Sequence, residues 1–279
     1  MFRRPIYKSE IDNRVFVDSK LKDSDNVKSF GFEWTEIDGY VGKETLSYGH
    51  IFGRFLLEEN FFQNKIIADI GCGNGRLGRI IAPYTSKYFG IELSESIFSF
   101  PKNIECKSLN LIQATGTDLP LRDNATDITL CWGVMHHMDK PFKGLNELIR
   151  VTKSGGTILI CIYPHTFNPR QNFNNFVKNI EENSKFDLIE KTSDYLDTWR
   201  EVDSFYADLL SKNIFLSVKK SREWQIFQWF DGITPQYHWS LETKLDEVLI
   251  EKQFQYIKTR PGCYKITNIN KNSTRSSIG

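Results

Sequence analysis

A glycine-rich segment that directly follows a short apolar stretch sets the strongest constraint on the fold. Ile66-Ile-Ala-Asp-Ile70 has the composition of a strand, and it leads into Gly71-Cys-Gly-Asn-Gly75. Gly71 allows a tight turn, and Gly73 allows a ligand to approach the backbone closely. Gly75 allows the following helix to pack closely on the strand. A helix over Arg76–Ala82 would complete a strand–turn–helix unit, the setting in which such loops bind nucleotide-like ligands.

Three nearby residues narrow the class of ligand. Arg76 stands where a dinucleotide fingerprint needs its third glycine, and the loop lacks the Gly-Lys-Ser/Thr ending of a phosphate-binding loop. Asp69 lies two residues before the first glycine, where a carboxylate can order the loop or accept a hydrogen bond from a cationic amino group. Glu92 closes the next strand, where an acid suits hydrogen bonds to ribose hydroxyls. Together they favour a ribosyl ligand without pyrophosphate.

Strand-like and helix-like segments alternate through the middle of the chain, which predicts parallel βαβ units. The expected strands are Lys65–Ile70, Tyr88–Ile91, Leu111–Ala114, Asp127–Trp132 and Thr157–Tyr163. The expected helices are Arg76–Ala82, Ser94–Phe98 and Pro141–Val151, and Lys153–Gly156 reads as a turn.

The segments outside this centre follow other patterns. Residues 1–30 are polar and predict a loosely packed arm with two short β-prone pieces, Pro5–Tyr7 and Val15–Val17, whereas apolar spacing over 44–62 predicts a helix. Residues 165–238 carry an apolar stripe at helical spacing. The pattern at the end of the chain predicts a helix, Ser240–Lys252, with Ser240 as its N-cap, and then an antiparallel hairpin formed by Gln255–Thr259 and Cys263–Thr267.

Composition excludes several classes of protein. The chain has 36 Lys and Arg against 35 Asp and Glu, so no strong basic excess points to nucleic acid. Its longest apolar run, Ile158–Tyr163, is too short to cross a membrane. The five cysteines form no Cys-x-x-Cys pair, which argues against a zinc site or a disulfide scaffold and fits a reducing cytoplasm. Of 38 aromatic residues only nine lie within 62–164, so the aromatic side chains are concentrated in the flanks.

Five ordered motifs resemble those of the class I S-adenosylmethionine-dependent methyltransferases. They are Asp69–Gly75, Gly90–Ser94, Gly116–Pro120 with Asn124–Asp127, Cys131–His137 and Lys153–Gly156. Two flanking stretches, Phe30–Trp34 and Asp231–Tyr237, are similar to segments of a bacterial subset that modifies small molecules or glycans. The resemblance implies a Rossmann-like, mostly parallel seven-stranded sheet with helices on both faces and an antiparallel seventh strand. It also implies a helical lid inserted between the fifth and sixth strands.

The same resemblance implies a set of residues around S-adenosylmethionine. Asp118 would contact the adenine amino group, with Leu119 beside the ring. The full expected cofactor set is Asp69, Gly71, Cys72, Gly73, Gly75, Glu92, Leu93, Asp118, Leu119, Trp132 and Gly133. Trp132 could equally be a core residue, and at Cys72 the backbone is expected to matter more than the thiol.

Candidates for chemistry and acceptor binding are fewer. Methyl transfer from a sulfonium is a direct displacement, so a base is needed only where the acceptor must lose a proton. His136 and His137 are candidates for that base because histidine titrates near neutral pH, although a purely structural role stays open. The residues that could face the acceptor are Trp34, Tyr163, His165, Tyr237 and His238.

We therefore expect one catalytic domain with a lid. The expected parts are an arm and helix over 1–61 that cover the active site, a cofactor-binding core over 62–164, a helical lid over 165–238, a helix and strand pair over 239–268 that completes the sheet, and a polar tail over 269–279. The expected activity is methyl transfer from S-adenosylmethionine to an O, N or C nucleophile of a small molecule or glycan precursor. The alternatives are a nucleotide-dependent oxidoreductase, a nucleic-acid or protein methyltransferase, and a non-catalytic cofactor-binding homologue.

Overall fold

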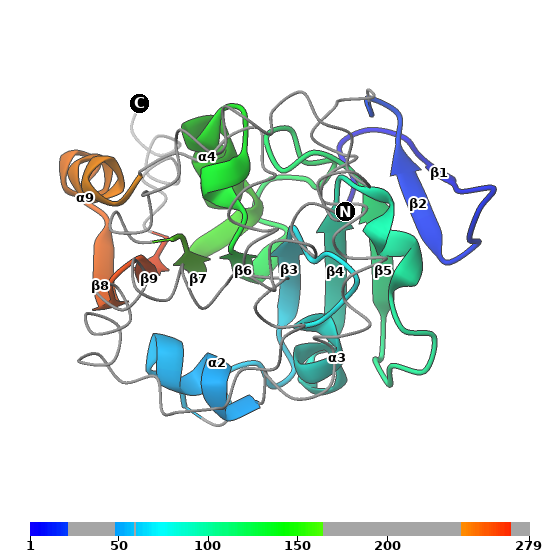
Figure 1. Cartoon of the computed structure of the whole chain (residues 1–279), viewed down its shortest axis with the longest axis horizontal. Coiled ribbons are helices and arrows are strands. Elements are labelled where there is room, and N and C mark those ends of the chain that lie inside the picture. The colour runs from blue at the N-terminus through cyan, green and yellow to red at the C-terminus, as the bar shows by residue number, and fades with distance from the viewer. Residues whose placement is uncertain (22–47, 59, 164–240, 269–279) are drawn as a thin grey trace, which may run out of the picture.

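The computed structural model describes residues 1–21, 48–58, 60–163 and 241–268. These residues form one mixed β-sheet with helices on both of its faces (Figure 1). The expected lid over 165–238 and the tail over 269–279 lie outside the described residues. Within the described part, no helix is long and apolar enough to cross a bilayer.

In the described residues the sheet has nine strands rather than the expected seven. They are β1 (Ile6–Lys8), β2 (Val15–Asp18), β3 (Ile66–Ile70), β4 (Lys87–Glu92), β5 (Leu109–Gln113), β6 (Thr126–Trp132), β7 (Thr152–Cys161), β8 (Gln255–Arg260) and β9 (Cys263–Thr267). Their spatial order is β1-β2-β5-β4-β3-β6-β7-β9-β8. The number exceeds seven because β1 and β2 extend the sheet past β5. The five strands from β3 to β7 are mutually parallel, as the alternation of segments predicted.

The order of strands reverses at β3. From β3 the chain proceeds outward through β4 and β5 on one side, and then returns to build β6 and β7 on the other. In parallel sheets such a reversal leaves a crevice at the carboxyl ends of the two strands that flank it. The glycine loop follows β3 and therefore opens at this crevice.

The C-terminal hairpin completes the sheet as predicted. β9 is antiparallel to both of its neighbours, β7 and β8. The helix before it, α9 (Glu242–Glu251), has Leu241 at its N-cap position, and no side chain caps it there. Ser240, the expected N-cap of this helix, lies outside the described residues. Leu241 is itself buried in the core, so apolar packing fixes the start of the helix.

The N-terminal segment is more ordered than its polar composition suggested. β1 and β2 form an antiparallel pair, and β2 adds in parallel to the outer edge of β5 (Figure 1). The expectation of a loosely packed arm was wrong, because the edge of β5 offers unpaired backbone groups that β2 satisfies. Val15 is fully buried at this junction. The residues of the two strands extend the sheet sideways past β5.

The helices divide between two apolar cores. α2 (Tyr48–Phe55) and α3 (Gly78–Ile81) cover one face, and α4 (Pro141–Val151) and α9 cover the other (Figure 1). α4 has its predicted bounds, whereas the predicted helix over 76–82 is only four residues long before a 3₁₀ segment containing Pro83. The expected helix at 94–98 is a 3₁₀ segment, Glu95–Ser99, capped by Ser94.

Strand β7 begins earlier than predicted. The stretch from Lys153 to Gly156 belongs to the strand, although Gly155 has a left-handed backbone with φ of 77°. The pairing with β6 is irregular between Thr126 and Ile128, which accommodates that glycine.

Candidate functional site

The ends of four adjacent strands bring the predicted cofactor motifs together. Gly71 follows β3, Glu92 ends β4, Thr115 lies just past β5, and Gly133 follows β6. Backbone hydrogen bonds link these loops to their neighbours: the Gly71 amide donates to Ile91 (2.7 Å), and the Ala114 amide donates to Glu92 (2.9 Å). The motifs are separated in sequence but share one edge of the sheet.

The glycine loop needs glycine on backbone grounds. Gly71, Gly73 and Gly75 have φ values of 75°, 54° and 86°, all in the left-handed region that side chains disfavour. A Cβ atom on Gly71 would lie 2.2 Å from Val134, and one on Gly75 would lie 2.5 Å from the Phe100 ring. The third glycine thus packs against an aromatic ring, which the sequence argument did not predict.

Glu92 holds the glycine loop in place. Its Oε2 accepts a hydrogen bond from the Gly73 amide (3.0 Å), while Oε1 accepts from the amides of Leu93 (2.9 Å) and Ser94 (2.8 Å). A carboxylate oxygen has room for more than one donor, so Glu92 can hold the loop and still face hydroxyl groups. The side chain is partly exposed, as a ligand contact requires.

Asp69 is buried behind the loop, with only 1% of its surface exposed. The Tyr88 hydroxyl donates a hydrogen bond of 2.5 Å to its Oδ2. Burial raises the pKa of Asp69 to about 7, aided by the nearby charge of Glu92 and opposed by the bond from Tyr88 and by Arg76. This position fits an internal support of the loop better than a direct contact to an amino group.

At the carboxyl end of β6, open space beside Gly133 adjoins a cluster of aromatic side chains around Trp132. Gly133 has a φ of 73°, and an added Cβ atom would meet nothing within 4 Å, so the backbone there borders open space. Trp132 is partly buried and packs edge-on against Phe55, with ring centroids 5.4 Å apart. The guanidinium of Arg54 lies over the indole at 4.9 Å. Trp132 therefore serves as part of the packing between α2 and the sheet while lying at the site edge.

Comparison with known proteins identifies the central part of the chain. Residues 68–160 match the family model of the methyltransferase domain. This region belongs to the class I S-adenosylmethionine-dependent methyltransferases. An uncharacterized methyltransferase of Mycobacterium leprae is 31% identical over 97 residues, 34% of this chain and 36% of that protein. A tRNA (carboxymethyluridine(34)-5-O)-methyltransferase of Arabidopsis thaliana is 28% identical over 38% of this chain and 26% of its own length.

The chain thus spans less than half the length of these two curated relatives. Among solved structures, a chain in the complex of the Haloferax volcanii Trm112 methyltransferase activator with a methyltransferase aligns at a TM-score of 0.44. That alignment has 17% identity and covers 55% of this chain and 68% of that one.

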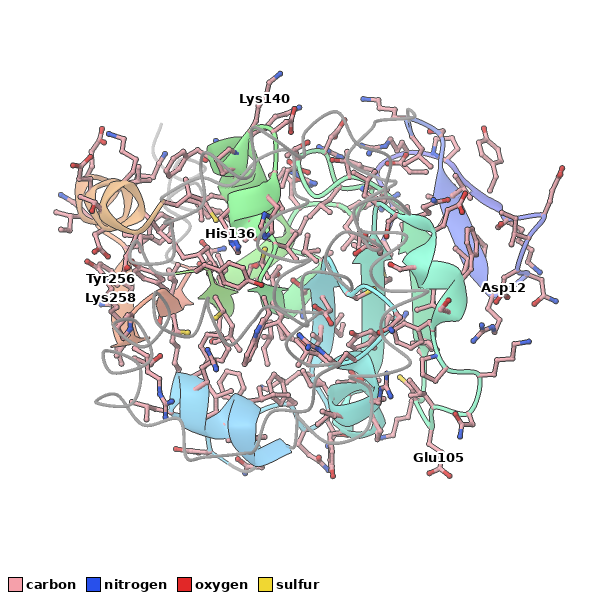
Figure 2. The ribbon with its side chains drawn as sticks, viewed as in Figure 1. Asp12, Glu105, His136, Lys140, Tyr256 and Lys258 are labelled. Carbon is pink, nitrogen blue, oxygen red and sulfur yellow. The ribbon has the colours of Figure 1, made fainter. Side chains whose placement is uncertain are left out.

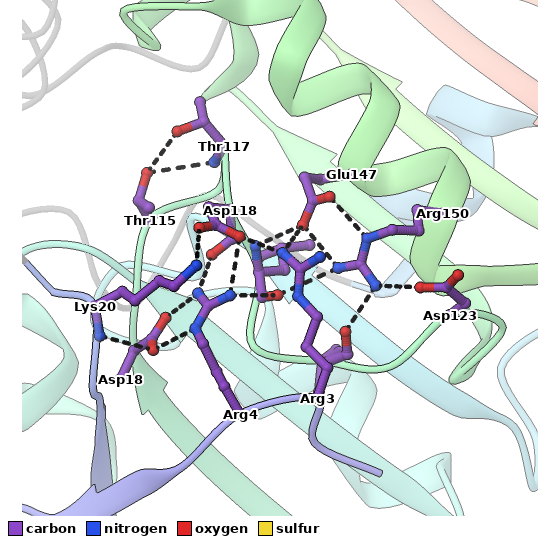
Figure 3. A network of polar contacts seen from close by, with 12 residues as sticks. Arg3, Arg4, Asp18, Lys20, Thr115, Thr117, Asp118, Asp123, Glu147 and Arg150 are labelled. Carbon is purple, nitrogen blue, oxygen red and sulfur yellow. Dashed lines mark hydrogen bonds and ion pairs between the residues drawn. The ribbon is translucent and has the colours of Figure 1, made fainter.

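Two residues expected at the adenine ring occupy other environments in this methyltransferase domain. Asp118 forms ion pairs with Arg3 and Arg4 from the N-terminal segment, the latter at 2.9 Å (Figure 3). Leu119 is fully buried in the apolar core, and its amide donates to Glu147 (2.6 Å). The placement of Leu119 beside the adenine ring therefore stays a prediction, and Asp118 lies at the centre of an ion-pair network.

Burial raises the pKa of Asp118, but the bond and charge of Arg4, together with Arg3 and Lys20, outweigh burial and leave the pKa below its ordinary value. Thr115 lies two residues past the end of β5, closer to the strand than Asp118, and its hydroxyl contacts that of Thr117 (3.0 Å).

His136 and His137 lie inside the methyltransferase domain. They form a 3₁₀ segment, Met135–His137, and are 0% and 5% exposed. The His136 ring lies 3.9 Å from that of His137 and 4.3 Å from that of Tyr163. Figure 2 shows His136 among interior side chains near α4, whereas Lys140 points outward. The three rings form one cluster, which sequence reasoning had named only as separate candidates.

The remaining predicted residues divide by position. Cys72 is buried, and burial, with the charges of Asp69 and Glu92, raises the pKa of its thiol well above the ordinary value, so it is no nucleophile. Leu93 is partly exposed beside Glu92. Among the residues described here, no group of His, Cys, Asp or Glu could hold a metal ion. The other acceptor candidates lie outside the described residues: Trp34, His165, Tyr237 and His238.

Several structurally important residues gave no signal in the sequence. Tyr88 reads as an ordinary strand residue, yet it binds Asp69. Arg54 reads as the polar side of a helix, yet it contacts Trp132 and two cysteine sulfurs. Arg3 and Arg4 lie in a segment that looked like a free arm, and only the pairing of β2 with β5 reveals their role.

Proposed function

We propose that this chain transfers a methyl group from S-adenosylmethionine to an O, N or C nucleophile of a small molecule or glycan precursor. The observation that carries the proposal is the glycine loop held by Glu92 at the point where strand order reverses, within a matched methyltransferase domain. Because the curated relatives are matched over only part of their length, the activity of the whole chain is an inference from this site.

The site has features that fit the cofactor. Gly133 borders open space at the carboxyl end of β6, and the left-handed glycines keep the loop after β3 free of side chains. The Glu92 carboxylate would hold the ribose hydroxyls, and the backbone of Gly71–Gly73 would face the amino-acid part. When bound, S-adenosylmethionine supplies a methyl group on a sulfonium, a good leaving group.

The protein's task is then to position the acceptor and exclude water. His136 and His137 are the proposed general bases for an acceptor that must lose a proton, with Tyr163 packed against them. Since both histidines are buried, such a role requires the acceptor to reach the imidazole rings past the adjacent Tyr163 ring. Residues 165–238 are proposed as the cover of the site, as the sequence pattern suggested.

The proposed acceptor class rests on the net charge of the segment that we propose as the cover of the site. The proposed cover, 165–238, carries nine basic against 11 acidic side chains, which disfavours contacts with a phosphate backbone. The Arabidopsis relative is named for a tRNA acceptor, so the domain alone does not dictate a small molecule.

Calorimetry with S-adenosylhomocysteine tests the cofactor assignment. We expect one site per chain, and Glu92→Ala should weaken binding by about 1–3 kcal/mol, roughly 5- to 150-fold, because buried hydroxyls lose their acceptor. Glu92→Gln should lose less affinity than Glu92→Ala, because the side-chain carbonyl oxygen of glutamine can still accept a hydrogen bond from a hydroxyl group.

Glu95→Ala is the matched control, because Glu95 is exposed three residues further on. Thermal unfolding of each variant separates loss of the site from loss of the fold. Absence of binding by the folded wild-type protein at millimolar ligand would refute the proposal.

A further inference from the structure

Two cysteines face each other across the pair formed by β7 and β9. Cys161, the last residue of β7, is in register with Cys263, the first residue of β9. The Ile162 amide donates to the Gly262 carbonyl (2.8 Å), which marks Cys161 and Cys263 as a non-hydrogen-bonded pair. In such pairs the Cα atoms lie about 4.5 Å apart, within the range that a disulfide spans. The two sulfurs are 3.1 Å apart, and both thiols are free.

A cation lies beside both sulfurs. The Arg54 guanidinium is 3.8 Å from the sulfur of Cys161 and 3.9 Å from that of Cys263. The Thr259 hydroxyl on β8 donates to the Arg54 carbonyl (2.6 Å), which ties this end of α2 to the hairpin. A guanidinium held against a thiol favours its thiolate, the form that reacts with oxidants.

The two thiols are inequivalent. The bond from the Cys161 thiol lowers the pKa of Cys263 to about 7; burial opposes this shift, and the charges of Arg54 and Arg260 add to it. The bond to Cys263 and burial together raise the pKa of Cys161 well above its ordinary value. The Cys263 thiol is therefore the more readily ionised of the two, and the Cys161 thiol beside it is placed to resolve an oxidised Cys263.

We propose that Cys161 and Cys263 form a redox-modification site that a peroxide closes to a reversible disulfide. The Cys263 sulfur attacks one peroxide oxygen, the O–O bond breaks, and the departing hydroxide takes a proton to leave as water. The Cys161 sulfur then attacks the resulting sulfenic sulfur. The S–O bond breaks, the S–S bond forms, and the hydroxyl leaves with the thiol proton as a second water. Two thiols are oxidised, and one peroxide is reduced to two waters.

The other cysteines lack this arrangement. Burial raises the pKa of Cys72 well above its ordinary value and that of Cys131 to about 12. Cys106 is partly exposed and lies 3.7 Å from the Thr85 hydroxyl. Cys161 and Cys263 are themselves buried, 5% and 1% exposed, so what distinguishes this pair is the short distance between its sulfurs and the adjacent Arg54 guanidinium.

The cysteine pair lies close enough to the proposed active site for its oxidation to affect that site. Arg54 also lies over Trp132, at the end of β6 beside the open space at Gly133. A disulfide removes the thiolate that Arg54 faces, so oxidation alters the charge environment next to the proposed acceptor side of the site.

Thiol counting and peptide mapping on the full chain test the proposal. The reduced protein is treated with hydrogen peroxide at pH 7.5, quenched and denatured with an alkylating reagent. We expect five alkylated cysteines before treatment and three after it, a mass loss of two hydrogens, and a cross-linked pair of peptides containing Cys161 and Cys263. Dithiothreitol should restore all five.

Three variants sharpen the test. Cys161→Ser should stop at the sulfenic acid on Cys263, which a dimedone probe traps, and Cys106→Ser should still lose two thiols. Arg54→Gln should slow oxidation by at least about fivefold, because less Cys263 is ionised, and Arg54→Lys should recover part of that rate.

Retention of five alkylated cysteines in the wild-type protein, or a linkage between any other pair, would overturn the proposal. The measurement uses the reduced protein without cofactor. It is therefore independent of whether S-adenosylmethionine binds.

Discussion

At the scale of single residues, two carboxylates near the site have opposite electrostatic environments. Asp69 is desolvated and bound only by the neutral Tyr88 hydroxyl among the contacts described above. Asp118 lies among arginines that hold its pKa down against the effect of burial. The two carboxyl groups therefore change the stability of the folded state in opposite directions. As the pH rises, ionisation of Asp69 makes the folded state less stable, whereas ionisation of Asp118 makes it more stable.

Asp69→Asn should remove a pH-dependent loss of stability. The folded-state pKa of Asp69 is about 7 against an ordinary 3.8, so the folded protein binds this proton more tightly than the unfolded chain. Stability is thus favoured at low pH and falls as the pH rises from about 4 to 7, by at most about 4 kcal/mol. Urea unfolding at pH 4.5, 6 and 8 should show that the free energy of unfolding of the variant, relative to that of the wild type, increases as the pH rises.

Asp139→Asn serves as the control, because Asp139 is exposed. Its stability relative to the wild type should stay constant over the same range. A constant difference for Asp69→Asn as well would contradict the assigned environment.

The residue-level site was only partly predictable from sequence. The three glycines and Glu92 could be found because their chemistry depends on backbone conformation and on spacing along adjacent strands. The environment of Asp118 could not, since it depends on Arg3 and Arg4, more than 100 residues away in sequence. Local patterns carry no information about such partners.

At the scale of elements, the N-terminal strand pair is joined to the core by an ion-pair network. Arg4 binds Asp18 on β2, with Nε donating to Oδ1 at 2.7 Å, and also binds Asp118 after β5. Glu147 and Arg150 extend the network onto α4 (Figure 3). The network links the sheet edge, a site loop and a helix, so it fixes the loop that follows β5.

Arg4→Ala should destabilise the fold strongly. The side chains of Arg4 and Asp18 are only 9% and 1% exposed, so the substitution leaves a buried carboxylate without its cation. Losing one partner of a buried pair costs about 3–5 kcal/mol, measurable as a shift of the urea midpoint.

Lys20→Ala is the comparison, because Lys20 is 64% exposed and lies 3.5 Å from Asp118. Removing this exposed partner should cost less than about 1 kcal/mol. Equal losses in the two variants would show that the N-terminal strands are not held by the buried pair.

At the scale of the whole molecule, the sequence predicted the core sheet well and its edges poorly. β3 to β7 and the antiparallel β9 follow from apolar runs separated by helices, which is a local signal. The local pattern marked Pro5–Tyr7 and Val15–Val17 as β-prone, but it did not predict that β2 pairs with the edge of β5, because that pairing is non-local. The uneven distribution of aromatic residues is consistent with the proposed division into a core and a cover.

The net charge of +1 predicts weak binding to nucleic acid. Filter binding with unmodified tRNA at 50 and 200 mM salt should show no tight complex at either concentration. A protein that makes six to ten phosphate contacts would instead lose roughly 10³- to 10⁵-fold in affinity over this range. Tight binding with that salt dependence would replace the small-molecule acceptor with RNA.

The position of β9 inside the sheet also has a consequence for synthesis of the chain. β9 pairs with β7 across a separation of 102 residues, as between Cys161 and Cys263. While the ribosome is still producing those intervening residues, β7 presents an unpaired edge, although β3 to β6 are already complete. Such non-local pairing slows folding and exposes a strand that can associate with other chains. Folding of this domain therefore requires a late-synthesised strand to pair beside an early one.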